Sequence, residues 1–282
     1  MPKNALAGIY TYAQFAVCFT AFMPVMALSS LRHRNDPTQR VPGRWMRRLG
    51  RTTSRLTPLW SFEIEGTPPA DIKYSPYVVI ANHESQADAF LLSYLPFDMR
   101  YVAKEELFTP PVSGWVMRWG GDIRVRRGEG ESVRAMMAES ERALTAGIPV
   151  MIFPEGTRSR DGNLLPFKDG AFALAIRMQL PILPIALAGT REMRPKHSLW
   201  FEKAHARARI LEPISTRGLG PNDIASLRDK ARARIEAALP ELRATSGRAA
   251  AGRAAAAPAT AKRAAAARAA AAPTAAGPAA AG

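Results

Sequence analysis

Short apolar runs alternate with longer amphipathic segments through the middle of the chain. Five of these runs are suited to buried strands: residues 77–81, 100–103, 123–125, 150–153 and 182–187. The segments between and after them predict helices near residues 88–95, 131–146, 169–178 and 222–239. Strands that alternate with helices predict an α/β fold, in which helices flank a mixed sheet.

The N-terminal segment has a different pattern, because residues 4–31 are mostly apolar and carry no charge. This is longer than the roughly 20 residues that a bilayer-spanning helix needs, although Gln14 and Pro24 weaken it as such a helix. We interpret it as a membrane anchor that either spans the bilayer or lies in one leaflet. Two alternatives are a signal peptide cleaved near residues 25–27, with only Lys3 as its basic start, and a buried core helix.

An arginine-rich stretch follows the apolar segment. By the positive-inside rule this flank stays cytoplasmic, which predicts a location at the cytoplasmic face of the cell inner membrane. Residues 41–60 interleave Trp45, Met46 and Leu49 with arginines, a mix that predicts a second helix at headgroup level. Residues 1–60 are therefore assigned to membrane anchoring. The arginines are Arg32, Arg34, Arg40, Arg44, Arg47, Arg48, Arg51 and Arg55.

The formal net charge of +15 is concentrated at the two ends of the chain. Residues 1–60 contribute +8 and residues 244–282 contribute +5, which leaves +2 for residues 61–243. This distribution favours a folded domain near an anionic surface over a nucleic-acid groove, so no specific nucleic-acid partner is expected. Residues 244–282 are rich in Ala, Pro and Arg and have no large apolar side chain to bury, which predicts a disordered tail.

The single cysteine, Cys18, lies in the apolar N-terminal run. One cysteine excludes an intrachain disulfide and a cysteine-based metal site. We expect it to be a small buried hydrophobe.

His83 follows the predicted strand 77–81, and Asp88 lies five positions later. In a single helix this step would place them about 140° apart, but a turn between strand and helix can bring them together. A carboxylate on one imidazole nitrogen fixes the tautomer and leaves the other nitrogen to accept a proton. The spacing alone is a weak signal, since His197 and Glu202 have the same offset. No second histidine stands at helical spacing, so no metal site is expected.

Two further segments carry polar groups at the ends of predicted strands. The segment FPEGTRSRDG begins at Phe153, and its Pro and Gly favour a tight connection that presents Glu155, Thr157 and Arg158. The segment GGDIRVRRGEG, residues 120–130, contributes three arginines near a short strand. Arginine can fork onto phosphate oxygens, although a solvated turn or a charged edge explains either segment taken alone.

Together these segments resemble the motifs of the glycerolipid acyltransferase family, in their order and spacing. Asn82, His83 and Asp88 match its Asn-His-x4-Asp motif, and Gly121, Ile123 and Arg127 match its second block. Phe153 to Ser159 match Phe-Pro-Glu-Gly-Thr-Arg-Ser without change, and Pro181 to Pro184 match an apolar Pro-x-x-Pro strand. The resemblance covers about residues 60–215. One departure is Arg126, at a position that is often acidic in the family.

The resemblance implies roles for individual residues. His83 would act as the general base on an acceptor hydroxyl and Asp88 would orient it. The hydroxyl would attack the donor thioester directly, so Ser85 is not expected to be a nucleophile. The acceptor phosphate would be held near Arg127 and Arg158. The residues expected to shape that site are Glu155, Gly156 and Thr157, and the additional anion contacts are Lys104 and Lys168.

The resemblance further implies a transferase that moves a fatty acyl group onto a lysophospholipid, with 1-acylglycerol-3-phosphate favoured as acceptor. The donor would be acyl-CoA or acyl-carrier protein, and no cofactor is expected. Residues 61–243 would form the catalytic domain. The alternatives are another lyso-lipid acceptor, such as a lyso-ornithine lipid, and a non-catalytic membrane scaffold, against which the intact His83 and Asp88 argue. A nucleic-acid binder driven by the basic ends is disfavoured by the near-neutral middle.

Overall fold

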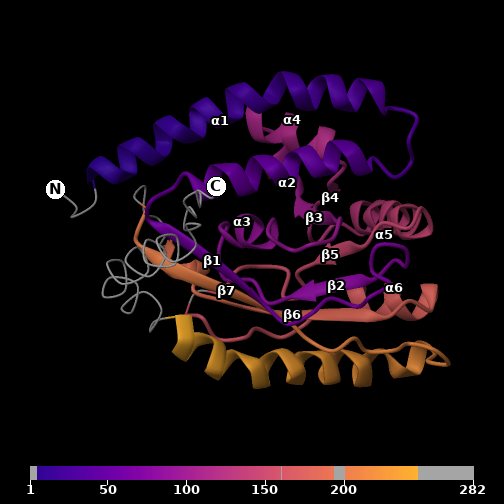
Figure 1. Cartoon of the computed structure of the whole chain (residues 1–282). Coiled ribbons are helices and arrows are strands. Elements are labelled where there is room, and N and C mark those ends of the chain that lie inside the picture. Colours follow the sequence, from indigo (N-terminus) through magenta and orange to yellow (C-terminus); the bar gives the residue numbers. More distant parts are fainter. Residues whose placement is uncertain (1–4, 160, 194–200, 247–282) are drawn as a thin grey trace, which may run out of the picture.

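A single sheet organises the molecule. A computed structural model of the chain describes residues 5–159, 161–193 and 201–246. Within these ranges seven strands pair in the spatial order β1-β7-β6-β2-β5-β3-β4 (Figure 1). This confirms the predicted α/β class and its mixed sheet. The strands are β1 (Trp60–Glu65), β2 (Val78–Ala81), β3 (Arg100–Lys104), β4 (Ile123–Val125), β5 (Val150–Ile152), β6 (Ile182–Ala188) and β7 (Ala204–Ile210).

The strand directions define two edges of the sheet. Strands β2 to β6 are mutually parallel, while β7 pairs antiparallel to β6 and β1 pairs parallel to β7. We call the edge at which β2 to β6 end the carboxyl edge, and the edge at which they begin the amino edge. In open parallel sheets, loops at the carboxyl ends of the strands commonly form the ligand site.

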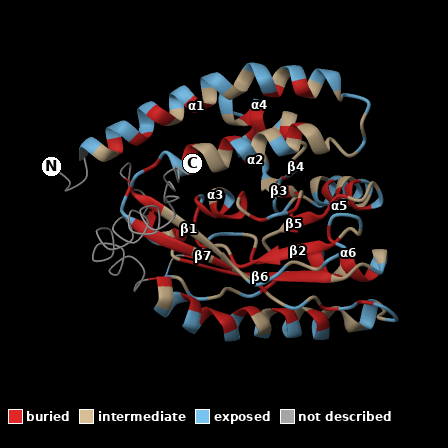
Figure 2. Cartoon of the chain, viewed as in Figure 1, coloured by how far each residue is buried: buried red, intermediate tan, exposed pale blue. Residues whose placement is uncertain are grey.

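Helices cover both faces of the sheet. One face packs against α5 (Gly130–Thr145), α6 (Gly170–Met178) and a helix over residues 224–246, around the fully buried Phe172. The other face packs against α3 (Asp88–Leu92) and parts of the N-terminal helices. Successive residues of β2 alternate between these two cores, with Val78 and Ile80 in one and Val79 in the other. The buried central strands lie between layers of more exposed helix (Figure 2).

The N-terminal helices form a separate small layer. Helix α1 (Ala5–Arg32) runs alongside α2 (Arg40–Arg55), and both contact α4 (Pro111–Gly120) (Figure 1). Cys18 is buried between these helices, as expected for a small hydrophobe. The segment Leu6–Arg32 is long and apolar enough to cross a membrane, by length and composition only. Its exposed apolar side chains are Leu6, Ile9, Tyr10, Tyr12, Val17, Val25, Leu28 and Leu31.

Some elements differ from the prediction. Helix α2 ends at Arg55, and β1 begins at Trp60, inside the segment expected to be one interfacial helix. Strands β1 and β7 and helix α4 were not predicted. The short elements are η1 (Glu105–Phe108), α7 (Thr190–Met193) and η2 (Pro221–Asp223). Except for its first three residues, the predicted disordered tail 244–282 lies outside the described residues.

Candidate active site

His83 and Asp88 meet at the carboxyl edge of the sheet. Strand β2 ends at Ala81 and α3 begins at Asp88, so a short turn reverses the chain between them. The His83 Nδ1 atom lies 2.7 Å from Oδ2 of Asp88. The His83 side chain is 16% exposed and that of Asp88 only 1%, so the imidazole alone faces the surface. The structure therefore brings together the two residues that the sequence analysis proposed as the general base and the carboxylate that orients it.

The surroundings of Asp88 fix the orientation of the imidazole. Oδ2 of Asp88 accepts hydrogen bonds from the backbone N–H groups of Glu84 (2.9 Å) and Ser85 (3.1 Å). Oδ1 of Asp88 accepts one from the Thr190 hydroxyl. Because the carboxylate acts as acceptor throughout, Nδ1 of His83 carries the hydrogen in this pair. The other ring nitrogen, Nε2, is then left to accept a proton.

Asn82 ends the pairing between β2 and β6. Its side-chain amide donates to the Leu187 carbonyl (2.9 Å) and accepts from the Leu187 N–H (2.7 Å), as a strand residue would. The regular register between these strands stops one residue earlier, at Ala81 and Ile185. His83 therefore leaves the sheet from a point that a buried side chain holds in place.

The loop after β5 is tied to the histidine turn. The His83 N–H donates to Oε1 of Glu155 (2.7 Å), and the Ser159 N–H donates to the His83 carbonyl (2.9 Å). The Phe153 ring stacks on the imidazole with centroids 4.1 Å apart. Burial raises the pKa of Glu155 above its ordinary value, while the N–H donors of His83 and Leu165 act in the opposite direction. Glu155 thus shapes the site from within the protein.

The next residues of this loop lie nearer the surface. Gly156 has φ +68°, and a β-carbon there would lie 3.0 Å from both Cε and Nζ of Lys168. A side chain at this position would therefore be strained and would displace the lysine. Thr157, Arg158 and Lys168 are exposed at the same edge.

The predicted phosphate-binding arginines form no hydrogen bond or ion pair with the described part of the chain. Among the described residues, neither Arg127 nor Arg158 makes a hydrogen bond or an ion pair, and both are exposed. By contrast Arg126 is paired with Glu105 (2.6 Å) and Glu129 (2.7 Å). Lys104 is paired with Glu106 at 2.7 Å. The charge of Arg126, the position that departs from the family pattern, is thus matched by neighbouring carboxylates.

The buried Ser85 is poorly placed to act as a nucleophile. Its hydroxyl oxygen accepts the Ala87 N–H at 3.3 Å, and its side chain lies beneath the turn. In the described ranges, no group of three or more His, Cys, Asp or Glu residues is arranged to hold a metal ion.

Three contributors to the site were not predicted as functional. Thr190 follows β6 and has no signal in the sequence beyond its place after an apolar strand. Arg243, on the helix over residues 224–246, lies 3.4 Å from the buried Glu84. Burial, together with the neighbouring Asp88 carboxylate, raises the pKa of Glu84 to about 8. Beside these groups a cavity of about 340 Å³ opens, lined in part by Glu84, Gly189 and Arg243.

Comparison with known proteins places this arrangement in a family. The family model described as acyltransferase matches residues 63–188. A 1-acyl-sn-glycerol-3-phosphate acyltransferase beta from Homo sapiens is 31% identical over 218 residues, covering 76% of this chain and 76% of that protein. This chain belongs to the glycerolipid acyltransferase family.

Further members of the glycerolipid acyltransferase family agree with this assignment. A 1-acyl-sn-glycerol-3-phosphate acyltransferase alpha from Ovis aries is 35% identical over 175 residues. That match spans 61% of this chain and 61% of the relative, about three fifths of each. The crystal structure of the 1-acyl-sn-glycerophosphate (LPA) acyltransferase PlsC from Thermotoga maritima is similar with a TM-score of 0.71 and 25% identity, covering 85% of this chain and 96% of that chain.

Proposed function

We propose that this acyltransferase-family protein moves a fatty acyl group onto the free hydroxyl of 1-acylglycerol-3-phosphate, giving phosphatidate. The hydrogen-bonded pair of His83 and Asp88, with the imidazole facing the surface, is the observation that carries this proposal. The printed names of the relatives favour lysophosphatidate as the acceptor.

The reaction balances with the groups present. Nε2 of His83 accepts the proton of the acceptor hydroxyl as its oxygen attacks the thioester carbonyl. The carbon–sulfur bond breaks, and the imidazolium returns the proton to the departing thiolate. An ester and a thiol are the products, so neither an oxidant nor a cofactor is needed. Asp88 stabilises the imidazolium and keeps Nδ1 protonated.

The acceptor phosphate is assigned to the cationic part of the carboxyl edge. Arg127 and Arg158 have donors that no described residue uses, and a phosphate monoester offers oxygens for bidentate contacts. Lys168, next to Gly156, adds a further positive charge. Acyl-CoA and acyl-carrier protein are both suitable donors, since either supplies the same thioester.

The N-terminal helices support a place at the cytoplasmic face of the inner membrane. Helix α1 exposes many apolar side chains, which a bilayer would cover. Because α1 runs beside the arginine-rich α2, burying α1 across a bilayer would draw those arginines into the hydrocarbon region. We therefore favour α1 lying in one leaflet over α1 spanning the membrane.

The test is an acyl-transfer assay on membranes that contain the full-length protein. Acyl-CoA or acyl-carrier protein is offered with lysophosphatidate, other lysophospholipids and lyso-ornithine lipid, and products are followed by mass spectrometry. His83→Ala is compared with His33→Ala, which removes a histidine at the turn between α1 and α2. We expect phosphatidate to form with His33→Ala and to disappear with His83→Ala.

Three results would redirect the proposal. A different acylated product, still dependent on His83, would keep the mechanism and change the acceptor. Equal product formation by His83→Ala and His33→Ala would remove the assigned base. No product from well-expressed protein with any donor or acceptor would favour a non-catalytic membrane scaffold.

A further inference from the structure

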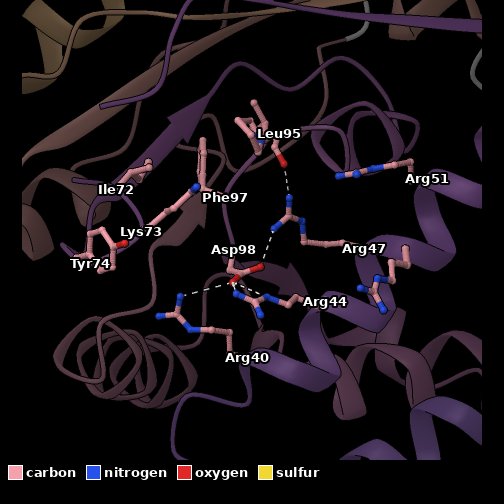
Figure 3. A pocket seen from close by; sticks show the side chains of 12 residues that line it. Arg40, Arg44, Arg47, Arg51, Ile72, Lys73, Tyr74, Leu95, Phe97 and Asp98 are labelled. Carbon is pink, nitrogen blue, oxygen red and sulfur yellow. Dashed lines mark hydrogen bonds and ion pairs between the residues drawn. The ribbon is translucent and has the colours of Figure 1, made fainter. Parts of the chain in front are cut away.

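A second cationic cavity lies at the amino edge of the sheet, between α2 and the segments that lead into β2 and β3 (Figure 3). Its volume is about 460 Å³. The order of segments along the chain explains its position, because residues 72–74 precede β2 and residues 95–98 precede β3. The cavity is thus at the opposite edge from His83, and belongs to neither the base nor the predicted phosphate arginines.

The cavity carries a large excess of positive charge. Asp98 is the only acidic residue among the described residues that line it, and it has ion pairs with Arg44 at 2.8 Å, Arg47 at 3.1 Å and Arg40 at 3.5 Å. Figure 3 shows these arginines converging on the single carboxylate. The basic residues lining the cavity are Arg40, Arg44, Arg47, Arg48, Arg51 and Lys73.

Several donors at this cavity have no protein acceptor. Among the described residues, Arg48 and Lys73 form neither a hydrogen bond nor an ion pair through their side chains, although the Arg48 guanidinium lies 4.6 Å from the Trp45 ring centroid. The Arg47 side chain is 8% exposed, yet its buried Nε has no hydrogen-bond partner. A buried donor without an acceptor is costly, so the described protein groups do not fully satisfy the Arg47 guanidinium. The excess of positive charge around the cavity favours an additional anion.

The walls of the cavity also have an apolar part. Ile72, Leu95 and Phe97 are buried, while Tyr74 is 84% exposed. A phosphate with a small organic group attached suits this combination of arginine donors and apolar wall. A monoester carries about −1.5 to −2 charges near neutral pH, more than a diester, and so matches the excess of cations better.

We propose that this cavity binds a phosphate monoester at a site separate from the catalytic one. Arg44, Arg48 and Lys73 supply the exposed donors, while Asp98 holds the arginines in position without neutralising them. The monoester can be the headgroup of an anionic lipid or a soluble phosphate. The proposal does not depend on which acceptor the enzyme uses.

The test is calorimetric binding to purified full-length protein in non-ionic detergent. The probes are dihexanoyl phosphatidate, dihexanoyl phosphatidylglycerol and inorganic phosphate. The variant Arg48→Gln/Lys73→Gln removes two charges from the cavity, and Arg217→Gln/Lys230→Gln removes the same two residue types from exposed positions elsewhere. A third variant, Arg127→Gln/Arg158→Gln, removes the two arginines assigned to phosphate at the carboxyl edge. It distinguishes binding there from binding in the cavity.

We expect the cavity variant to weaken phosphatidate binding at one site by about 10- to 100-fold, the effect of losing charge-assisted contacts. The control should bind like the wild type, and Arg127→Gln/Arg158→Gln should retain the cavity site. If binding of inorganic phosphate weakens to the same extent, the site is assigned to free phosphate. If only binding of phosphatidate weakens, the site is assigned to a lipid headgroup.

Two outcomes would overturn the proposal. Identical binding of every probe by the cavity variant and its control would show that the cavity holds no phosphate. Binding of phosphatidylglycerol as strong as that of phosphatidate would reject the monoester assignment. Circular dichroism and melting temperature of both variants establish that they fold alike.

Discussion

The two edges of the sheet use charged residues in opposite ways. At the carboxyl edge Arg127 and Arg158 have no ion pair with a described residue, while Asp88 is satisfied by the protein. At the amino edge three arginines converge on Asp98 and fasten α2 to the segment before β3. Arginines that converge on a carboxylate fasten the framework and can still offer their remaining donors, whereas exposed arginines without a partner among the described residues offer all of their donors to a ligand.

Buried titratable groups show the same contrast. Burial raises the pKa of Glu84, beside the hydrogen-bonded pair of His83 and Asp88, to about 8. At the amino edge, burial lowers the pKa of Arg47 below its ordinary value, and Asp98 acts in the opposite direction. Beside His83 the charged form of an acid is therefore costly, and beside Asp98 the charged form of a base is costly.

Asp88→Asn should have the largest effect and confine it to catalysis. The neutral amide no longer stabilises the imidazolium that forms when Nε2 accepts a proton, and its NH2 group faces either the Thr190 hydroxyl or the donors now bound to Oδ2. We expect kcat/KM to fall about 10³- to 10⁴-fold. Steady-state kinetics measure this, with Asp229→Asn on an exposed helix face as the control. Retention of a tenth of wild-type activity by a folded variant would contradict the assigned role.

Glu84→Gln should change how stability depends on pH. The pKa of Glu84 is raised in the folded protein from an ordinary value of 4.5 to about 8, so folding is favoured by its proton. That stability is fully present below pH ~4.5 and is lost as pH rises through about 8. The linked free energy is on the order of 5 kcal/mol.

Melting temperatures of wild type and Glu84→Gln between pH 5 and 9 measure this difference. The wild type should lose stability over that range, and the variant should lose less. Glu106→Gln, at an exposed carboxylate, is the control and should leave the wild-type slope unchanged. Parallel curves for wild type and Glu84→Gln would exclude Glu84 as the titrating group.

Asp98→Asn should lower the stability of the fold at the amino edge and leave the rate of acyl transfer unchanged. It leaves the partly buried arginines without their carboxylate, and we expect the free energy of unfolding to fall by about 2–3 kcal/mol. Below the melting temperature kcat should change little. Urea denaturation measures the loss, with Asp169→Asn as the control because its pair with Arg228 is exposed. A loss of kcat without a loss of stability would link this edge to catalysis.

Arg127→Gln and Arg158→Gln should have the smallest effect, confined to acceptor binding. Each variant should raise KM for lysophosphatidate about tenfold, with the melting temperature unchanged because neither arginine loses a hydrogen bond or an ion pair with a described residue. Arg124→Gln, an exposed arginine on β4, is the matched control. A lowered melting temperature with unchanged KM would assign these arginines to the framework.

The sequence predicted the elements whose residues are apolar throughout. The central strands β2, β5 and β6 were found because both of their faces are buried. Strands β1 and β7 were missed because charged residues interrupt them. Their charges are paired across the strands, for example Arg209 with Glu65 at 2.7 Å, and such partners lie far apart in the sequence. The alternation of apolar positions in WSFEIE was the available signal.

The candidate site was predictable to the extent that it lies in contiguous motifs. His83 and Asp88 lie within one turn, and Phe153 to Ser159 form one loop, so each could be recognised locally. Thr190 and Arg243 reach the site from elements more than a hundred residues away, and only the fold brings them there. The membrane assignment, the domain boundaries and the phosphate-binding residues stay predictions.

Asn82 has a consequence for how quickly this region opens. Its side chain forms hydrogen bonds with both the N–H and the carbonyl of Leu187, so both backbone groups of that residue are satisfied at the end of the sheet beside His83. The Leu187 amide proton should consequently exchange with solvent as slowly as those at the centre of the sheet, although it lies next to the turn that carries His83. The turn to which we assign the base is therefore attached to a part of the sheet that opens only when the sheet itself unfolds.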